Sequence, residues 1–130
     1  MMPIAYVTLG TNDPDRARPF WEALASALGG GIVQEVPGRA FCCELGGGGR
    51  IWVTRPFDGA PASIGNGVTV GLAVDGTGSV DRAHAAGLAA GGSDEGAPGP
   101  RPQYGPGIYV GYLRDPDGNK LALAHAAPPA

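Results

Sequence analysis

Apolar and polar residues alternate along several short segments of the chain, as they do in half-buried strands. In the first half these segments are residues 4–10, 31–36, 39–45 and 50–54. Between the first two segments the apolar period lengthens to that of an amphipathic helix. The apolar face of this helix consists of Ala17, Phe20, Trp21, Leu24 and Leu28. The pattern predicts one strand, one helix and three further strands.

The start of this helix is also encoded locally. Asn12 or Asp13 provides an N-cap, and Pro14 suits the first helical position. Pro19 lacks a backbone N–H donor and would disturb the turn before it. We therefore expect an irregular first turn, with regular helix only from about Arg16.

The second half of the chain repeats this order of elements. We expect a strand at residues 67–74, a helix capped by Ser79 and ending near Gly91, and strands at residues 107–114 and 119–125. One strand of the repeat is not visible, because the stretch where it should lie is rich in glycine and proline.

Together the elements predict an α+β fold of two βαβββ modules in a single domain over residues 1–130. The first module covers residues 1–60 and the second covers residues 66–126. The 24 glycines and 13 prolines cluster at the expected turns, while the apolar periodicity persists between them. A chain of this length can bury a substantial core, so an ordered domain is expected.

Charge and targeting features argue against several partners. The net charge is −3, and charges of both signs are interspersed without a basic stripe. We therefore expect no binding to nucleic acid or to an anionic membrane, while a small molecule or a protein partner stays open. The first residues lack a basic segment followed by a long apolar run, and no run of about 18 apolar residues occurs. A cytoplasmic location is the expectation.

The two cysteines, Cys42 and Cys43, are adjacent in a predicted strand. Successive strand side chains point to opposite faces, so these thiols cannot pair with each other. We interpret them as buried thiols in a reducing compartment, in preference to a redox or nucleophilic pair.

The remaining titratable candidates favour structural roles. His84 falls within the second helix, where we expect a partly exposed flank, and His125 ends the last strand on the face opposite to Ala122. Asp115 and Asp117 lie in a tight turn, where aspartate commonly accepts hydrogen bonds from its own backbone, so a catalytic role is disfavoured.

Several segments rich in Gly, Pro, Asn and Asp follow one another in a distinctive order over nearly the whole chain. They are residues 6–10, 12–14, 20–21, 54–59, 65–67, 89–92, 96–102, 104–107 and 115–119. Their order and spacing resemble those of the glyoxalase, bleomycin-resistance and dioxygenase superfamily, also called the vicinal oxygen chelate proteins. The resemblance implies two curved sheets with helices on the convex side and a ligand on the concave side.

The resemblance also implies where a metal would be held. The matching positions are Tyr6 and Thr69 on the first strands and Trp52 and Ala122 on the fourth strands, and the family's usual glutamate is replaced by Ala122. A phenol, a hydroxyl, an indole and a methyl group are poor ligands for transition metals. We therefore expect no metal and no cofactor.

Strand parity indicates which side chains line the concave side. Tyr6 and Thr8 share one face, and we expect Trp52 and Thr54 to join them beside Phe41 and Cys43. If Arg114 pairs with Asn119 in the last hairpin, then Tyr109, Gly111 and Leu113 lie on the same side as Ala122 and Ala124. Residues 96–107 form either a spacer or a pocket rim that carries Arg101, Gln103 and Tyr104. No catalytic residue is predicted, and the predicted ligand-binding residues are Tyr6, Thr8, Trp52, Thr54, Arg55, Thr69, Tyr104 and Tyr109.

Three functional hypotheses follow. The favoured one is a metal-free protein that binds an apolar or aromatic compound in a cavity between the modules. The alternative is a metal-dependent lyase, isomerase or dioxygenase of the same superfamily. A third is an enzyme without metal that uses Tyr6 or Tyr109 as acid and base, with Arg55 as the nearest candidate cation. In each case the alternative is that Trp52 fills the predicted cavity as part of the core. Open sheet edges also favour a homodimer.

Overall fold

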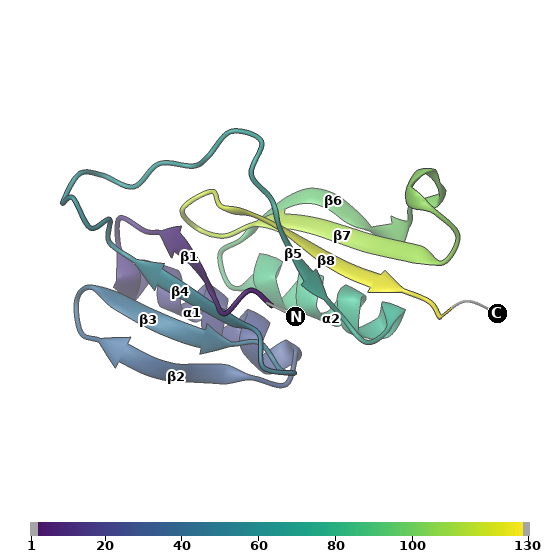
Figure 1. Ribbon diagram of the computed structural model, residues 1–130, viewed down its shortest axis with the longest axis horizontal. Helices are drawn as coiled ribbons and strands as arrows, with labels where there is room; N and C mark the ends of the chain where they lie inside the picture. Colours follow the sequence, from purple (N-terminus) through teal and green to yellow (C-terminus); the bar gives the residue numbers. More distant parts are fainter. Residues whose placement is uncertain (1–2, 129–130) are drawn as a thin grey trace.

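The computed structural model describes residues 3–128 and consists of two βαβββ modules joined by residues 55–69 (Figure 1). The first module contains β1 (Val7–Gly10), α1 (Pro14–Ala27), β2 (Gly31–Val36), β3 (Ala40–Glu44) and β4 (Arg50–Thr54). The second contains β5 (Val70–Ala73), α2 (Thr77–Ala89), β6 (Ser93–Pro100), the short 3₁₀ helix η1 (Pro102–Tyr104), β7 (Ile108–Arg114) and β8 (Lys120–Ala126). The predicted α+β fold of two modules is confirmed.

Each module folds into one four-stranded mixed sheet with the same strand order. The orders are β1-β4-β3-β2 and β5-β8-β7-β6, in which β1 runs parallel to β4 and β5 runs parallel to β8. Both helices lie on the same side of the two sheets, as Figure 1 shows. The first strand of each module is shorter than predicted, so Tyr6 and Thr69 lie just before β1 and β5.

Helix α1 begins at Pro14, the predicted first helical position, and it is regular from there rather than only from about Arg16. Asp13 is its N-cap and accepts a hydrogen bond of 3.1 Å from the Arg16 backbone N–H, and Pro14 is the first helical residue. Pro19 lies inside the helix without ending it. Because Pro19 has no backbone N–H, the Asp15 carbonyl lacks its helical hydrogen-bond donor. Pro19 and Asp15 are both exposed, so water can donate a hydrogen bond to that carbonyl.

The bounds predicted for the helix of the second module were wrong, whereas the strand that was not visible in the sequence is present. Helix α2 begins at Thr77, with Gly76 as N-cap, rather than after a Ser79 cap, and it ends at Ala89. The missing strand is β6, whose pairing with β7 shifts register twice, between Asp94 and Gly96 and between Gly96 and Gly99. These irregularities interrupt the alternation that would have revealed the strand.

One continuous core joins the two modules on the helix side of the sheets. The residues of β1 and β5 that pack toward this core, as strand parity predicted, are Val7, Leu9, Val70 and Leu72. The two helices also contact each other across it. Its largest fully buried side chains include Phe20, Trp21, Leu24, Ile51, Leu113, Leu121, Leu123, Val53 and Val80.

The hairpin between β7 and β8 has a different register from the one predicted. Arg114 pairs with Lys120, so the turn contains residues 115–119 and is one residue longer than expected. A slip of one residue exchanges the two faces of a strand. Tyr109, Gly111 and Leu113 therefore lie on the helix side, and Tyr112 rather than Gly111 is opposite Ala122.

The turn is organised by the buried carboxylate of Asp115. It accepts hydrogen bonds from the backbone N–H groups of Asp117 and Asn119, from the Asn119 amide, and from Trp21 Nε1 at 3.3 Å. Burial raises the pKa of Asp115, and the hydrogen bonds from Asn119 and Trp21 oppose that rise. The prediction that this aspartate bonds its own turn is confirmed.

Candidate functional site

The face of the first sheet that lies opposite the helices carries Trp52 at its centre. Trp52 pairs with Thr8 on one neighbouring strand and with Cys42 on the other, while Thr54 pairs with Ala40. Trp52 and Thr54 are partly buried and Thr8 is exposed. The structure thus brings these three predicted residues together on one face.

The expected neighbours of Trp52 were wrong. Phe41 and Cys43 pair with Val53 and Ile51 and belong to the core on the helix side. The residue beside Trp52 is Cys42, which is fully buried. Residues that pair directly opposite each other on β3 and β4 place their side chains on the same face of the sheet.

Tyr6 and Arg55 lie at the margins of this face. Tyr6 precedes β1 and is 58% exposed. The Arg55 guanidinium donates hydrogen bonds to the Gly38 carbonyl at 3.0 Å and to the Asn12 carbonyl at 2.9 Å. Asn12 in turn holds Ala62 through two hydrogen bonds, so Arg55 and Asn12 fasten the linker between the modules.

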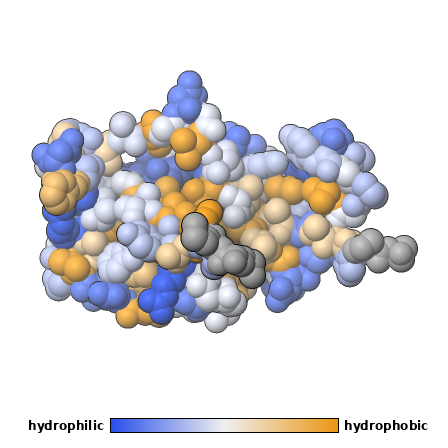
Figure 2. All heavy atoms as spheres, in the orientation of Figure 1, coloured by the Kyte–Doolittle hydropathy of each residue, from blue (hydrophilic) through white to orange (hydrophobic). Residues whose placement is uncertain are grey.

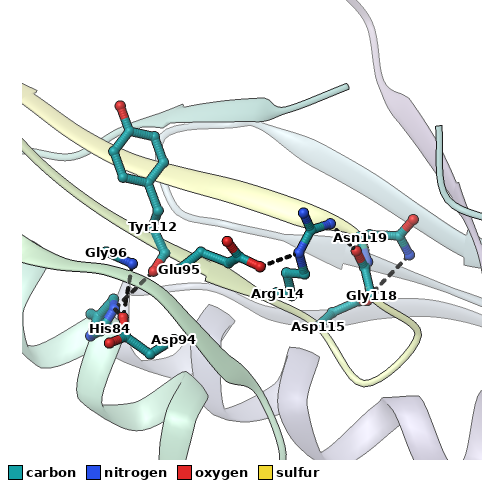
Figure 3. A network of polar contacts seen from close by, with 9 residues as sticks. All are labelled: His84, Asp94, Glu95, Gly96, Tyr112, Arg114, Asp115, Gly118 and Asn119. Carbon is teal, nitrogen blue, oxygen red and sulfur yellow. Dashed lines mark hydrogen bonds and ion pairs between the residues drawn. The ribbon is translucent and has the colours of Figure 1, made fainter. Parts of the chain in front are cut away.

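The corresponding face of the second sheet is lined by small residues around one tyrosine. Ala122 lies between Gly71 on β5 and Tyr112 on β7. A Cβ added to Gly71 would meet no atom within 4 Å, so the space above it is open. Thr69 is exposed just before β5. Figure 3 shows the Tyr112 ring projecting away from the helices, on the same side as Arg114 and Glu95.

Tyr112 was missed because the predicted register placed Tyr109, Gly111 and Leu113 on this face and Tyr112 on the opposite one. Two cations flank its ring, with Lys120 Nζ at 5.2 Å and Arg101 Cζ at 5.8 Å from the ring centroid. The only sequence feature that could have found it was the length of the turn at residues 115–119, since a five-residue connection sets the pairing of Arg114 with Lys120.

Tyr109 and Tyr104 lie apart from this face. Tyr109 donates a hydrogen bond of 2.6 Å to Asp81 on α2, and that bond raises the pKa of Tyr109. Tyr109 also lines a hollow of about 280 Å³ together with His125 and the prolines of residues 100–106. Tyr104 is 66% exposed on η1. A phenol with a raised pKa is a poor general base, which weakens the hypothesis of acid–base catalysis by Tyr109.

The two histidines are held by structural contacts. His84 is buried, contrary to the partly exposed flank that we expected, and its Nε2 lies 3.0 Å from the Tyr112 carbonyl oxygen and 3.2 Å from Asp94. It packs there because α2 lies against the helix side of β7. His125 Nδ1 lies 2.9 Å from the Val74 carbonyl oxygen.

Two further hollows border the second sheet. One of about 510 Å³ is bordered on one side by β5 and on the other by the end of α1 and the β3–β4 hairpin. Its lining includes Gly71, Ala73, Asp75 and Ser79. Another, of about 690 Å³, extends along β5 and β8 to Ile108. Both reach the open face of β5, and neither is lined by any of the eight predicted ligand-binding residues.

The four positions that the family resemblance assigned to a metal carry side chains whose donor chemistry does not fit a metal ion. Tyr6, Trp52, Thr69 and Ala122 offer no imidazole and no carboxylate. Within residues 3–128, no group of three or more His, Cys, Asp or Glu side chains is arranged to hold a metal ion. No chemical step is therefore derived through a metal. The same part of the chain contains no helix long and apolar enough to cross a membrane.

Comparisons with known proteins define the class. The model of the Glyoxalase/Bleomycin resistance protein/Dioxygenase superfamily matches residues 3–123, and the chain belongs to this family. A glyoxalase/bleomycin resistance protein from Albidiferax ferrireducens T118 is 37% identical, with a TM-score of 0.83 over 96% of this chain and 98% of that chain.

More distant structures share the fold alone. A lactoylglutathione lyase from Agrobacterium tumefaciens is 21% identical, with a TM-score of 0.68 over 96% of this chain and 94% of that chain. TioX from Micromonospora sp. ML1 is 23% identical, with a TM-score of 0.65 over 98% of this chain and 99% of that chain. No curated protein matches the sequence.

Proposed function

We propose that this chain is a metal-free binding protein that holds a flat, apolar or aromatic small molecule against the open faces of its sheets. The observation that carries the proposal is the composition of those faces. Trp52 and Tyr112 are large aromatic side chains whose paired residues on the neighbouring strands are small, and open space lies above Gly71. Aromatic rings bind flat ligands through apolar contact and stacking, and small neighbours leave room for them.

The absence of metal is a separate part of this proposal, and it rests on the donor set at Tyr6, Trp52, Thr69 and Ala122. Elemental analysis of the purified protein should find no stoichiometric Zn, Ni, Mn or Fe, and a chelator should leave the melting temperature unchanged. About one bound transition metal per site, with loss of stability on chelation, would favour a metal-dependent lyase, isomerase or dioxygenase instead.

Ligand binding can be measured by tryptophan fluorescence, because Trp52 is one of only two tryptophans. A bound aromatic compound from a broad panel should quench the emission. Trp52→Ala should then weaken binding of that compound by about 1–3 kcal/mol, the usual contribution of a buried aromatic contact.

Trp21→Ala is the matched control. Trp21 is fully buried on the helix side, where its ring meets Phe20 edge to face at 5.3 Å. Its removal should destabilise the fold by about 3–5 kcal/mol. If Trp52→Ala behaves like Trp21→Ala and no compound binds the parent protein, Trp52 fills the hollow as core and the binding proposal fails.

We further propose that the protein forms a twofold homodimer. In the part of the chain that the structure describes, strands β1 and β5 each pair on one side only, so both modules present a free edge. Apolar surface gathers across the middle of Figure 2, over the region where these strands lie in Figure 1. Exposed side chains near the two strands include Ile4, Tyr6, Ile64 and Val68. A second copy is the expected cover for such edges and apolar surface.

A further inference from the structure

The open face of the second sheet combines an aromatic ring with positive charge. Lys120 precedes Ala122 by two residues on β8, so both side chains share the face on which Tyr112 lies. Lys120 Nζ and Arg101 Cζ both lie within 6 Å of the Tyr112 ring centroid. One cation precedes Tyr112 in the sequence and the other follows it, and both converge on this one ring.

Local contacts hold these groups in position. Arg101 donates to the Ala97 carbonyl at 2.8 Å and to the Pro100 carbonyl at 3.2 Å, which fixes its guanidinium beside β6. Gly96 permits this arrangement, because a Cβ there would come within 3.1 Å of Tyr112 Cδ2. The ring can therefore lie directly against the β6 backbone.

The positive charge at this ring is not neutralised within the part of the chain that the structure describes. Glu95 is the nearby carboxylate on the same face, and it forms an ion pair with Arg114 (Figure 3). Neither Lys120 nor Arg101 takes part in an ion pair among residues 3–128. This local excess contrasts with the net charge of −3 of the whole chain.

We propose that the ligand is an aromatic compound with an anionic group, bound with its ring beside Tyr112 and its negative charge in contact with Lys120 and Arg101. This inference rests on the proposed binding function and names the ligand class. A neutral aromatic compound would use the ring but leave two partly desolvated cations without a negatively charged partner. An aromatic acid satisfies both features, and charge complementarity then sets the specificity of the site.

The composition of the chain offers a sharp probe, because Lys120 is its only lysine. Reductive methylation with ¹³C-formaldehyde retains the positive charge and labels Lys120 and the N-terminal amine alone. Benzoate, naphthoate and indole carboxylates are titrated against their uncharged amides. The Lys120 methyl resonance should shift with the acids, and the acids should bind about tenfold more tightly than the amides.

Two variants distinguish the effect on binding of a charge at the site from the effect of the protein's net charge. Lys120→Gln should weaken binding of the acids about tenfold and leave the amides unchanged. Arg82→Gln removes one positive charge from an exposed position on α2, where Arg82 bonds Ser79 at 3.0 Å, and should change acid binding less than about twofold.

The outcomes distinguish the two proposals. If acids and amides bind equally and the Lys120 resonance does not move, the ligand class proposed here is wrong while the binding function stands. If both variants weaken acid binding equally, the preference reflects net charge and the site at Tyr112 is also overturned. If neither acids nor amides bind, both proposals fail.

Discussion

Cys42 and Cys43 are adjacent in β3 yet lie in different environments. Cys42 lies beside Trp52 on the open face, and Cys43 lies in the core with its Sγ 3.6 Å from the Trp21 carbonyl oxygen. Both are fully buried. Burial raises the pKa of both thiols, that of Cys43 to about 12, with the neighbouring Cys42 and Glu44 adding to the rise for Cys43.

A first prediction follows from these pKa values. The native protein should not react with a thiol reagent at about pH 8, because little thiolate forms and the sulfur atoms are inaccessible, whereas both cysteines should react after unfolding. Since the folded pKa of Cys43 exceeds its usual value near 9, its contribution to stability is complete below that pH and declines toward pH 12. Denaturant midpoints measured over this alkaline range should fall less for Cys43→Ala than for the parent. Rapid labelling of the native protein would contradict the expectation.

A second prediction at the residue scale concerns Asp115, whose carboxylate receives four hydrogen bonds. Asp115→Ala leaves these donors unpaired in a buried turn and should destabilise the fold by about 3 kcal/mol in urea denaturation. Asp117→Ala is the control in the same turn, because among residues 3–128 the Asp117 side chain accepts a hydrogen bond only from the exposed Asn12 N–H. It should cost less than about 1 kcal/mol, and equal costs for the two variants would refute the assignment.

At the scale of elements, local patterns predicted most of the fold but not its pairing details. The alternation in residues 50–54 and the apolar face of α1 correctly located β4 and the helix that covers it. The register of β7 with β8 could not be read from alternation alone, because it depends on how residues 115–119 arrange their turn around Asp115. Strand β6 was hidden for a similar reason, since its glycines and prolines carry little periodicity.

A prediction at this scale tests how closely α2 packs on its neighbours. A Cβ on Gly87 would meet Leu113 Cδ1 at 2.5 Å and Phe20 Cε2 at 3.1 Å, both in the core. Gly87→Ala should therefore destabilise the protein by about 1–3 kcal/mol despite the better helix propensity of alanine. Thermal and urea denaturation measure the effect.

Gly78 on the same helix provides the control. A Cβ there would come within 3.2 Å only of the flexible Arg82 Nη1. Gly78→Ala should thus be neutral or stabilise the protein by up to about 1 kcal/mol. Stabilisation by both substitutions would mean that α2 packs less closely on β7 and α1 than the structure indicates.

At the scale of the whole molecule, the candidate site could be predicted only in part. Pairing of β4 with its neighbours places Thr8, Trp52 and Thr54 on one face, as parity indicated. Arg55 could not be assigned from its position, because its role depends on carbonyls of Gly38 and Asn12 that come close only in the folded chain. The convergence of Arg101 and Lys120 on Tyr112 likewise depends on tertiary structure.

The last prediction concerns assembly at this same scale. We expect sedimentation velocity at micromolar concentration to report a dimer. A second copy would bury the free edges of β1 and β5 together with the exposed Ile4 and Val68. Val68→Asp should shift the equilibrium toward monomer by placing a charge in that interface. Val33→Asp is the matched control, because Val33 is similarly exposed, at 51% against 57%, but lies on the distant edge strand β2. A parent protein that sediments only as a monomer would remove the proposal, and equal dissociation by both variants would place the interface elsewhere.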